Sequence, residues 1–103
     1  LKGIQAAVTR QRADGSPQGG WHPELRISVQ EAVAGYTRTP AQAYGMAGEW
    51  GTLAPGARAD LIVLAQDLFT IDPMDIASTK VLMTLVQGRA VHDDLGQGAA
   101  MRL

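Results

Sequence analysis

The side chains that could do chemistry in this sequence are few and far apart. The chain has two histidines and no cysteine, and neither His22 nor His92 belongs to an H-x-H or H-E-x-x-H pattern. A catalytic metal needs about three convergent protein ligands. An enzyme built on His22, His92 and Asp60 would therefore require three distant residues to meet without a motif. No nucleophile elbow, P-loop or dinucleotide fingerprint is present. We expect no catalytic residue and no metal ligand within this chain.

A long loop carries the charged residues best placed to meet a substrate. Residues 10–26 are rich in glycine and in turn dipeptides, and a loop of this length in a compact domain is usually functional or flexible. Its cluster of Arg10, Arg12 and Asp14 could face a ligand, although a solvated charge cluster is the commoner explanation. For His22, in the same loop, a functional role competes with a structural one.

Helical patterns flank this loop. Apolar residues recur at helical spacing over residues 3–9, which predicts a short helix. Ser28 and Glu31 predict a capping box, in which the hydroxyl accepts the Glu31 N–H and the carboxylate accepts the Ser28 N–H. A further helix is expected with Thr39 as its N-cap, a proline at its first position and Gly48 at its C-terminal end.

Strand patterns follow in the second half of the chain. Leu61–Leu64 is a continuous apolar run of strand length, which predicts burial on both faces. Residues 81–92 predict a hairpin with Gly88 in its tight turn. The tail from Asp94 is expected to be poorly ordered. Because the chain offers only modest helices to cover this sheet, we expect something outside the sequence to cover it or pair with it.

Three residues before the first strand are expected to have structural roles. Pro55 and Gly56 fit the central positions of a type II turn, since proline fixes the first φ and glycine accepts a positive second φ. A lone carboxylate without a visible partner more often satisfies backbone donors than acts as an acid. We therefore expect Asp60 to accept hydrogen bonds from N–H groups around the Pro55-Gly56 turn.

Composition excludes several classes of function. The 103 residues suffice for one domain or a piece of one, and a start at Leu1 rather than Met fits a tag-derived start, a proteolytic fragment or an excised segment. The net charge of −1 gives no footprint for nucleic acid or anionic lipid. The run Leu61–Leu64 is far shorter than the roughly 20 apolar residues that span a bilayer. A cytoplasmic location is the expectation, which the lack of cysteine fits without proving.

Two long motifs make the chain resemble a known family. G-T-L-A-P-G-A-R-A-D-L-I-V-L, residues 51–64, followed by V-L-M-T-L-V-Q-G-R-A-V, residues 81–91, resembles the carboxyl end of amidohydrolase-superfamily enzymes. The upstream stretches G-I-Q-A-A-V-T-R-Q-R-A-D-G and I-S-V-Q-E-A-V-A-G-Y-T are similar to amidohydrolase family 3, the branch that contains N-substituted formamide deformylases. The resemblance covers residues 3–92.

The resemblance implies an α+β fragment of a larger fold. Residues 1–49 would be the end of a metal-dependent (β/α)8 barrel, comprising the loop after its last strand and the terminal helices. Residues 50–103 would be the carboxyl-terminal strands of a small β-sandwich whose other strands come from the amino-terminal part of the polypeptide. The amino-terminal remainder of the same enzyme is thus the implied partner.

The resemblance also implies the chemistry of the intact enzyme. A divalent metal, with zinc as the expectation, would activate water against an amide-type, non-peptide C–N bond of a small molecule. All the family's metal ligands would lie upstream of Leu1, so this segment would bind no metal and be inactive alone. Thr9 and Arg10, together with His22, are its candidates for lining the substrate pocket, and the substrate itself stays open.

A second hypothesis is a stand-alone interaction module that binds a protein partner through its sheet edge. A fragment should have an unpaired edge and an uncovered apolar face, and should therefore self-associate in isolation. A free-standing module should instead be monomeric and fold cooperatively.

Overall fold

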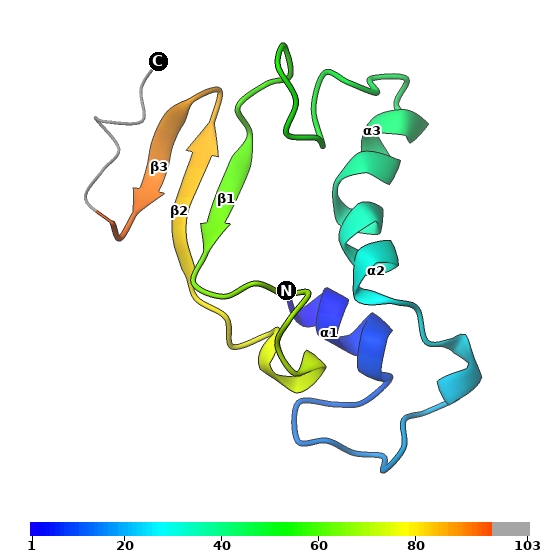
Figure 1. Ribbon diagram of the computed structural model, residues 1–103. Coiled ribbons are helices and arrows are strands. Elements are labelled where there is room, and N and C mark those ends of the chain that lie inside the picture. The colour runs from blue at the N-terminus through cyan, green and yellow to red at the C-terminus, as the bar shows by residue number, and fades with distance from the viewer. Residues whose placement is uncertain (96–103) are drawn as a thin grey trace. The chain divides into compact units, whose positions relative to one another are not determined.

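The computed structural model describes residues 1–95 and contains helices followed by one antiparallel sheet (Figure 1). The helices are α1 (Lys2–Thr9), α2 (Val29–Tyr36) and α3 (Arg38–Ala43), with the short 3-10 helices η1 (Pro23–Leu25) and η2 (Pro73–Asp75). The strands are β1 (Leu61–Leu64), β2 (Val81–Val86) and β3 (Arg89–Asp93). The predicted α+β composition is confirmed. From residue 96 on, the tail that was expected to be poorly ordered lies outside the described residues.

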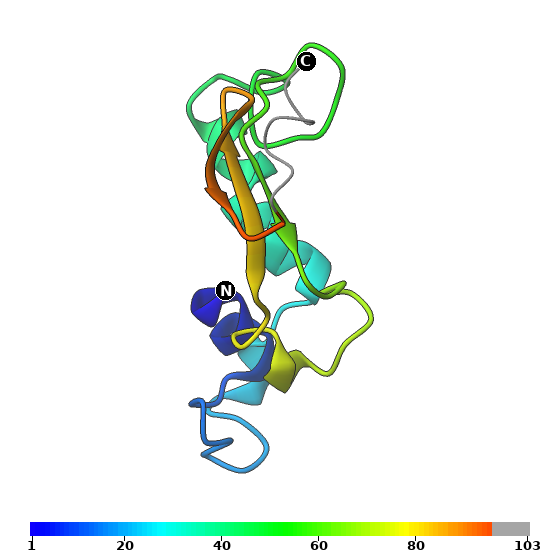
Figure 2. The same ribbon diagram turned by 90° about the vertical axis from the view of Figure 1, so that its left-hand side faces the viewer.

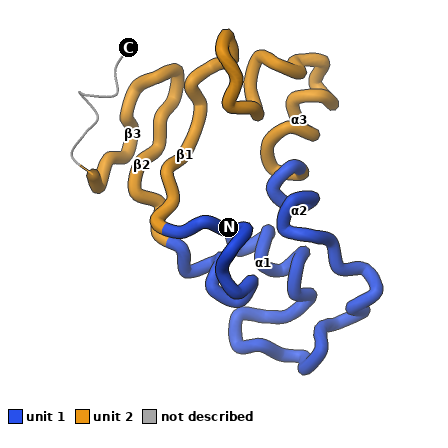
Figure 3. Tube along the Cα trace, in the orientation of Figure 1, with its two compact units in different colours: residues 1–34, 66–79 blue, residues 35–65, 80–103 orange. Residues whose placement is uncertain are grey.

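The chain forms two compact units that alternate along the sequence (Figure 3). Unit 1 comprises residues 1–34 and 66–79, and contains α1, η1 and η2. Unit 2 comprises residues 35–65 and the chain from residue 80 on, and contains α3 and the sheet. The last two residues of α2 fall on the unit 2 side of the boundary.

Unit 1 is built around the packing of α1 on η2. Its buried apolar side chains are Ile4, Ala32, Leu68 and Ile76. Three polar side chains are buried with them, and each one has a hydrogen-bond partner. The Gln5 Oε1 atom accepts the Ala77 N–H at 2.7 Å, and the Thr9 hydroxyl donates to the Gln5 carbonyl at 2.8 Å. The Thr79 hydroxyl lies 3.0 Å from the carbonyl of Asp75. Buried polar side chains therefore connect the two separate chain segments of this unit.

The first turn of α2 has both hydrogen bonds of a capping box. The Ser28 Oγ atom accepts the Glu31 N–H at 3.0 Å, and the Glu31 carboxylate accepts the Ser28 N–H at 3.1 Å. Two of the N–H groups that a helix start leaves without intrahelical partners are satisfied in this way.

Helix α3 begins and ends earlier than the sequence pattern predicted. Its N-cap is Thr37 rather than Thr39. The helix tolerates Pro40 at its third position because the first N–H groups of any helix have no intrahelical acceptor. At the other end, the N–H groups of Gly45 and Met46 donate to the carbonyls of Gln42 and Ala41. This is a Schellman motif with Gly45 at φ 71°, so Gly45 ends the helix and not Gly48.

The sheet has the order β1-β2-β3, and both pairings are antiparallel (Figure 2). The predicted hairpin is confirmed: Val86 pairs with Arg89 across the turn. Gln87 and Gly88 both have positive φ, at 50° and 77°, as a type I′ turn requires. The register shifts once in each pairing, between Val63 and Leu64 and between Thr84 and Leu85.

The first strand is less buried in this chain than its apolar composition predicted. None of the residues Leu61–Leu64 is fully buried, and the side chain of Ile62 is 49% exposed. Ile62 pairs with Thr84, so Val86, two residues further along β2, lies on the same face of the sheet. Val86 is 47% exposed. One face of the sheet therefore presents apolar side chains to solvent, whereas the buried Met83 and Leu85 lie on the other.

The connection into β1 contains the expected turn but gives Asp60 a different partner. The Ala57 N–H donates to the Ala54 carbonyl at 3.0 Å, and Gly56 has φ 91°, as a type II turn requires. Asp60 was expected to accept N–H groups around this turn. Instead its carboxylate accepts the Gln87 N–H at 2.8 Å, in the hairpin turn far along the sequence. The adjacent Gly88 N–H donates to the Ala59 carbonyl at 3.1 Å.

Candidate functional site

The loop that follows α1 folds back on itself and creates a concave surface in unit 1. The Arg12 N–H donates to the Ser16 carbonyl at 2.7 Å, and the Trp21 N–H donates to the Arg10 carbonyl at 2.8 Å. Gly20 closes the loop against α1, and a Cβ atom at this position would lie 2.8 Å from the Thr9 carbonyl oxygen. Glycine is therefore required where the returning chain meets the end of the helix.

Arg10 is the centre of this arrangement. It ends α1 in the left-handed region, at φ 57°, and its N–H donates to the Ala6 carbonyl. Its Nε–H donates to the Trp21 carbonyl at 2.8 Å, while the guanidinium carbon lies 5.1 Å from the centroid of the Trp21 ring. A hydrogen bond and a cation–π contact thus hold one cation in a fixed position.

The concave surface has a volume of about 580 Å³. The residues that line it include Arg10, Gln11, Arg12, Ser16, Pro17 and Trp21. Two cations, an amide and an indole therefore face the same space. This combination suits a ligand with an anionic group and an apolar body.

Thr9 and His22 occupy different positions from Arg10. Thr9 is buried; its hydroxyl donates to the Gln5 carbonyl and accepts the Gln11 N–H at 3.2 Å. It contributes to a second hollow of about 230 Å³, which Arg26 and Asp72 also line. His22 is exposed, with its Nδ1 atom 3.2 Å from the Glu24 carboxylate and its ring edge-on to Trp21. Of the three pocket candidates, only Arg10 lines the larger hollow.

Asp14, one of the two acidic residues of this loop, is held by hydrogen bonds that lower its pKa. The Asp14 carboxylate accepts hydrogen bonds from the Ser16 hydroxyl at 2.6 Å and from the Ser16 N–H at 2.9 Å. These bonds, and to a lesser degree the charge of Arg12, lower the pKa of Asp14. Because its oxygen is engaged with Ser16, Asp14 stabilises the turn.

No three His, Asp or Glu side chains within residues 1–95 come together to hold a metal ion. His92, in unit 2, has its Nε2 atom 3.0 Å from the Val81 carbonyl and 3.5 Å from the Asp94 carboxylate. His22 belongs to unit 1. The donor set of the described residues therefore does not fit a catalytic zinc site, which needs about three convergent ligands.

The sequence matches the amidohydrolase family over residues 1–92. The chain belongs to this family. The match includes both the loop with Arg10 and Trp21 and the whole sheet apart from its last residue.

Individual relatives of this amidohydrolase chain are longer proteins. The N-substituted formamide deformylase of Arthrobacter pascens is 34% identical over 87% of this chain and 16% of the relative. The protein YtcJ of Bacillus subtilis (strain 168) is 30% identical over 90% of this chain and 18% of the relative. The 5-methylthioadenosine/S-adenosylhomocysteine deaminase of Symbiobacterium thermophilum is 36% identical over 65% of this chain and 17% of the relative. The amidohydrolase chain thus spans less than a fifth of each.

No solved structure gives a significant match to the amidohydrolase chain. Among the described residues, no helix has both the length and the apolar character needed to cross a membrane.

Sequence reasoning undervalued two residues of the larger hollow. Arg12 was named only as part of a charge cluster, and Trp21 was not among the predicted site residues. Trp21 is in fact 63% exposed and lies under the Arg10 guanidinium. The turn dipeptides between Arg10 and Trp21 were the available signal for this contact. Consecutive turns can return the chain to the end of the helix, beside Arg10.

Proposed function

We propose that this chain is the carboxyl-terminal part of a metal-dependent amidohydrolase that acts on non-peptide C–N bonds of the amide type. The observation that carries the proposal is the family match over residues 1–92. The chain spans only 16 to 18% of the length of two relatives, which suits a part of a longer enzyme. One relative is named a formamide deformylase and another a deaminase, and both names describe cleavage of a C–N bond.

In this proposal, residues 1–49 complete a (β/α)8 barrel and residues 50–103 supply strands to a small β-sandwich. The metal, which we propose to be zinc, is held by ligands from the rest of the enzyme, because the described residues contain no three-ligand group. Such a metal would supply Lewis-acid activation of water against the amide-type bond. This chain contributes a loop beside the pocket, with Arg10 as its fixed cation, and is inactive alone.

The sheet supports the view that a covering segment exists outside this chain. Within the described residues, β1 and β3 pair only with β2, so each has an unpaired edge. Ile62 and Val86 add an exposed apolar face. Unpaired edges and exposed apolar faces promote association. We propose that strands from the amino-terminal remainder occupy this surface.

The unpaired edges also support a second candidate, a stand-alone module that adds a strand from a protein partner. The two functions predict different behaviour. A module is monomeric and cooperatively folded alone, whereas a segment that lacks its covering strands self-associates.

The first test asks whether the isolated chain associates with itself through the exposed face of its sheet. We expect the isolated 103-residue chain to form dimers or larger species by light scattering at micromolar concentration. Ile62→Thr with Val86→Thr should weaken this association about tenfold, since two apolar groups leave the interface. Leu53→Thr is the matched control, because Leu53 is 83% exposed but lies in a loop. A monomeric wild-type chain with a sharp unfolding transition would favour the module.

The second test concerns catalysis by the intact protein. We expect it to hydrolyse a simple N-substituted formamide, to lose this activity on treatment with a chelator and to regain it with zinc. Hydrolysis that a chelator leaves unchanged would overturn metal dependence. Absence of hydrolysis across formamide, carbamate and acyl-amino acid substrates would overturn the proposed reaction.

A further inference from the structure

The larger hollow of unit 1 has a cation whose position is fixed before any ligand arrives. Arg10 is held by its Nε–H bond to the Trp21 carbonyl and by its contact with the indole ring. No other hydrogen bond or ion pair within residues 1–95 engages this guanidinium. Its terminal Nη groups therefore keep their donors for a ligand. A preorganised fork loses less conformational entropy on binding than a free side chain does.

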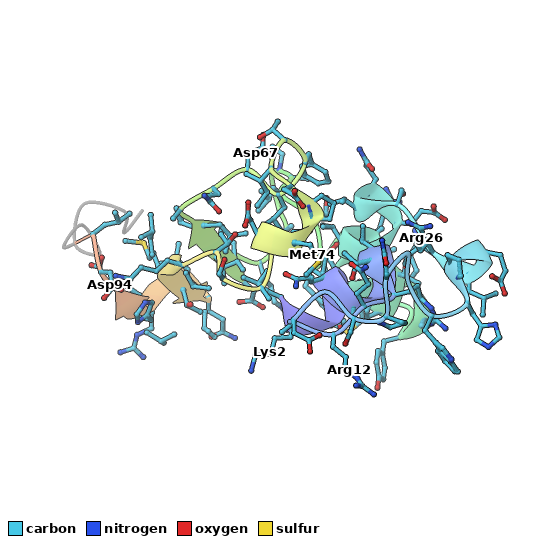
Figure 4. The ribbon with its side chains drawn as sticks, turned by 90° about the horizontal axis from the view of Figure 1, so that it is seen from below. Lys2, Arg12, Arg26, Asp67, Met74 and Asp94 are labelled. Carbon is cyan, nitrogen blue, oxygen red and sulfur yellow. The ribbon has the colours of Figure 1, made fainter. Side chains whose placement is uncertain are left out.

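Arg12 supplies a second cation that is also available. Its side chain is exposed and extends away from the loop (Figure 4), and within the described residues it takes part in no hydrogen bond or ion pair. The nearest carboxylate in sequence, Asp14, is engaged by Ser16 through two hydrogen bonds. The positive charge at the hollow is therefore not neutralised by a close ion pair.

Trp21 adds an apolar surface beside these two cations. Its ring is 63% exposed, although Arg10 covers part of it and the His22 ring touches it edge-on. A large exposed indole next to two guanidinium groups suits a ligand that has an apolar or aromatic body and ends in a planar anion.

We infer that Arg10, Arg12 and Trp21 form a subsite for a carboxylate attached to an apolar or aromatic body. Guanidinium groups match the planar, two-oxygen geometry of a carboxylate. The net charge of −1 argues against a nucleic acid as the ligand. The inference rests on the proposed function in one respect: it assigns the intact amidohydrolase to substrates that carry a carboxylate besides the bond to be cleaved.

Binding can be measured on the 103-residue chain, without metal and without catalysis. The probes are phenylacetate, its neutral analogue phenylacetamide, and phenyl phosphate, each titrated while NMR follows the Trp21 indole N–H and the Arg10 Nε–H. Trp50→Phe identifies the Trp21 signal, because the chain has two tryptophans. We expect phenylacetate to shift both signals and phenylacetamide to shift neither at the same concentration.

A matched pair of variants assigns the effect to the hollow. Arg12→Gln removes one charge from an exposed side chain that makes no hydrogen bond or ion pair among the described residues, so the fold should persist, and the dissociation constant for phenylacetate should rise about tenfold. Arg89→Gln removes an exposed arginine of β3, in unit 2, and should leave the constant unchanged. If both variants raise the dissociation constant equally, net charge alone explains the effect and the subsite is overturned.

The remaining outcomes also decide the inference. Equal shifts with phenylacetamide would overturn the role of the anion, and tighter binding of phenyl phosphate would overturn the choice of carboxylate. No shift with any probe, in a chain whose amide spectrum is well dispersed, would overturn the subsite while leaving the hydrolase proposal intact. Conversely, an intact protein that binds phenylacetate but hydrolyses no C–N bond would overturn the proposed function alone.

Discussion

Different contacts connect the chain segments within each of the two units. In unit 1, buried polar side chains connect separate segments, as in the hydrogen bond from the Ala77 N–H to Gln5. In unit 2, backbone groups approach closely, as Gly51 does at the Thr37 backbone and the Gly88 N–H at the Ala59 carbonyl, beside the bond from the Gln87 N–H to Asp60. Loss of the Gln5 acceptor should therefore weaken unit 1, and an added methyl group at Gly51 should weaken unit 2.

The two units also differ in how much apolar surface they leave in water. Among the described residues, each unit has one fully buried large side chain, Ile76 in unit 1 and Met83 in unit 2. Within residues 1–95, the exposed large apolar residues are more numerous in unit 2. They are Tyr36, Tyr44, Leu53, Ile62, Val86, Val91 and Leu95 in unit 2, and Trp21, Leu25, Ile27 and Phe69 in unit 1. The sheet unit is thus the one that leaves more large apolar side chains in water among the described residues.

The largest expected effect tests the close backbone approach in unit 2. A Cβ atom at Gly51, whose φ is 78°, would collide with the Thr37 backbone, so Gly51→Ala should lower the free energy of unfolding by about 3 kcal/mol or more. Gly48→Ala is the matched control, because Gly48 has φ 83° and open space around it. It should cost about 1 to 2 kcal/mol. Equal losses in urea unfolding would show that the collision is relieved by movement of the chain.

The next effect tests the polar connection in unit 1. Gln5→Met keeps the length of the side chain but leaves the Ala77 N–H without its acceptor, which should cost about 1 to 3 kcal/mol. Gln11→Met removes an exposed hydrogen bond to the Pro17 carbonyl and should change stability by less than about 0.5 kcal/mol. Hydrogen exchange should show faster exchange at Ala77 in the first variant. If both variants unfold at the same urea concentration, the buried bond does not stabilise unit 1.

A smaller effect is expected at the hairpin turn. Asp60→Ala removes the acceptor of the Gln87 N–H and should destabilise the chain by about 1 kcal/mol, because Gln87 is held at positive φ. Asp60→Asn retains an acceptor oxygen and should keep most of the stability that Asp60→Ala loses. The exchange rate of the Gln87 amide is the direct measurement. Faster exchange in the Asn variant as well would mean that charge, and not the acceptor, is what matters.

The smallest effect is a dependence on pH in the loop of unit 1. The pKa of Asp14 is lowered from 3.8 chiefly by its hydrogen bonds to Ser16. The contribution of these bonds is therefore present above the unfolded-state pKa and is lost as pH falls through the lower folded-state pKa. The chemical shift of the Ser16 amide should titrate below pH 3.8 in the wild type. It should stay constant in Asp14→Asn, and a titration there would assign the transition to another group.

Local signals predicted much of this fold because they depend on neighbours in the sequence. The reciprocal bonds of Ser28 and Glu31 span one helical turn, and the Gln87-Gly88 turn joins adjacent strands. The limits of α3 were missed because the sequence offers alternative caps at both ends. Thr37 and Thr39 compete at the N-terminal end, where Thr37 is the N-cap. Gly45 and Gly48 compete at the C-terminal end, where the Schellman bonds select Gly45.

Long-range contacts could not be predicted from pattern. The Asp60 carboxylate reaches Gln87, and the Trp21 ring lies under Arg10, through turns whose combined geometry no periodicity encodes. In the candidate site, Arg10 was proposed from the family resemblance and, with Arg12, from the charge cluster of its loop, whereas the position of Trp21 beside them depended on how the loop returns. The exposure of Ile62 likewise reflects what covers the sheet, which a strand pattern does not specify.

The alternation of the two units along the chain has a consequence for synthesis and for cleavage. Residues 66–79 of unit 1 lie between β1 and β2, and residues 35–65 of unit 2 separate the two segments of unit 1. In a nascent chain, β1 therefore cannot pair with β2 until the second segment of unit 1 has been synthesised. A single protease cut cannot release either unit whole, so limited digestion should give nicked molecules whose pieces remain associated until denaturant is added.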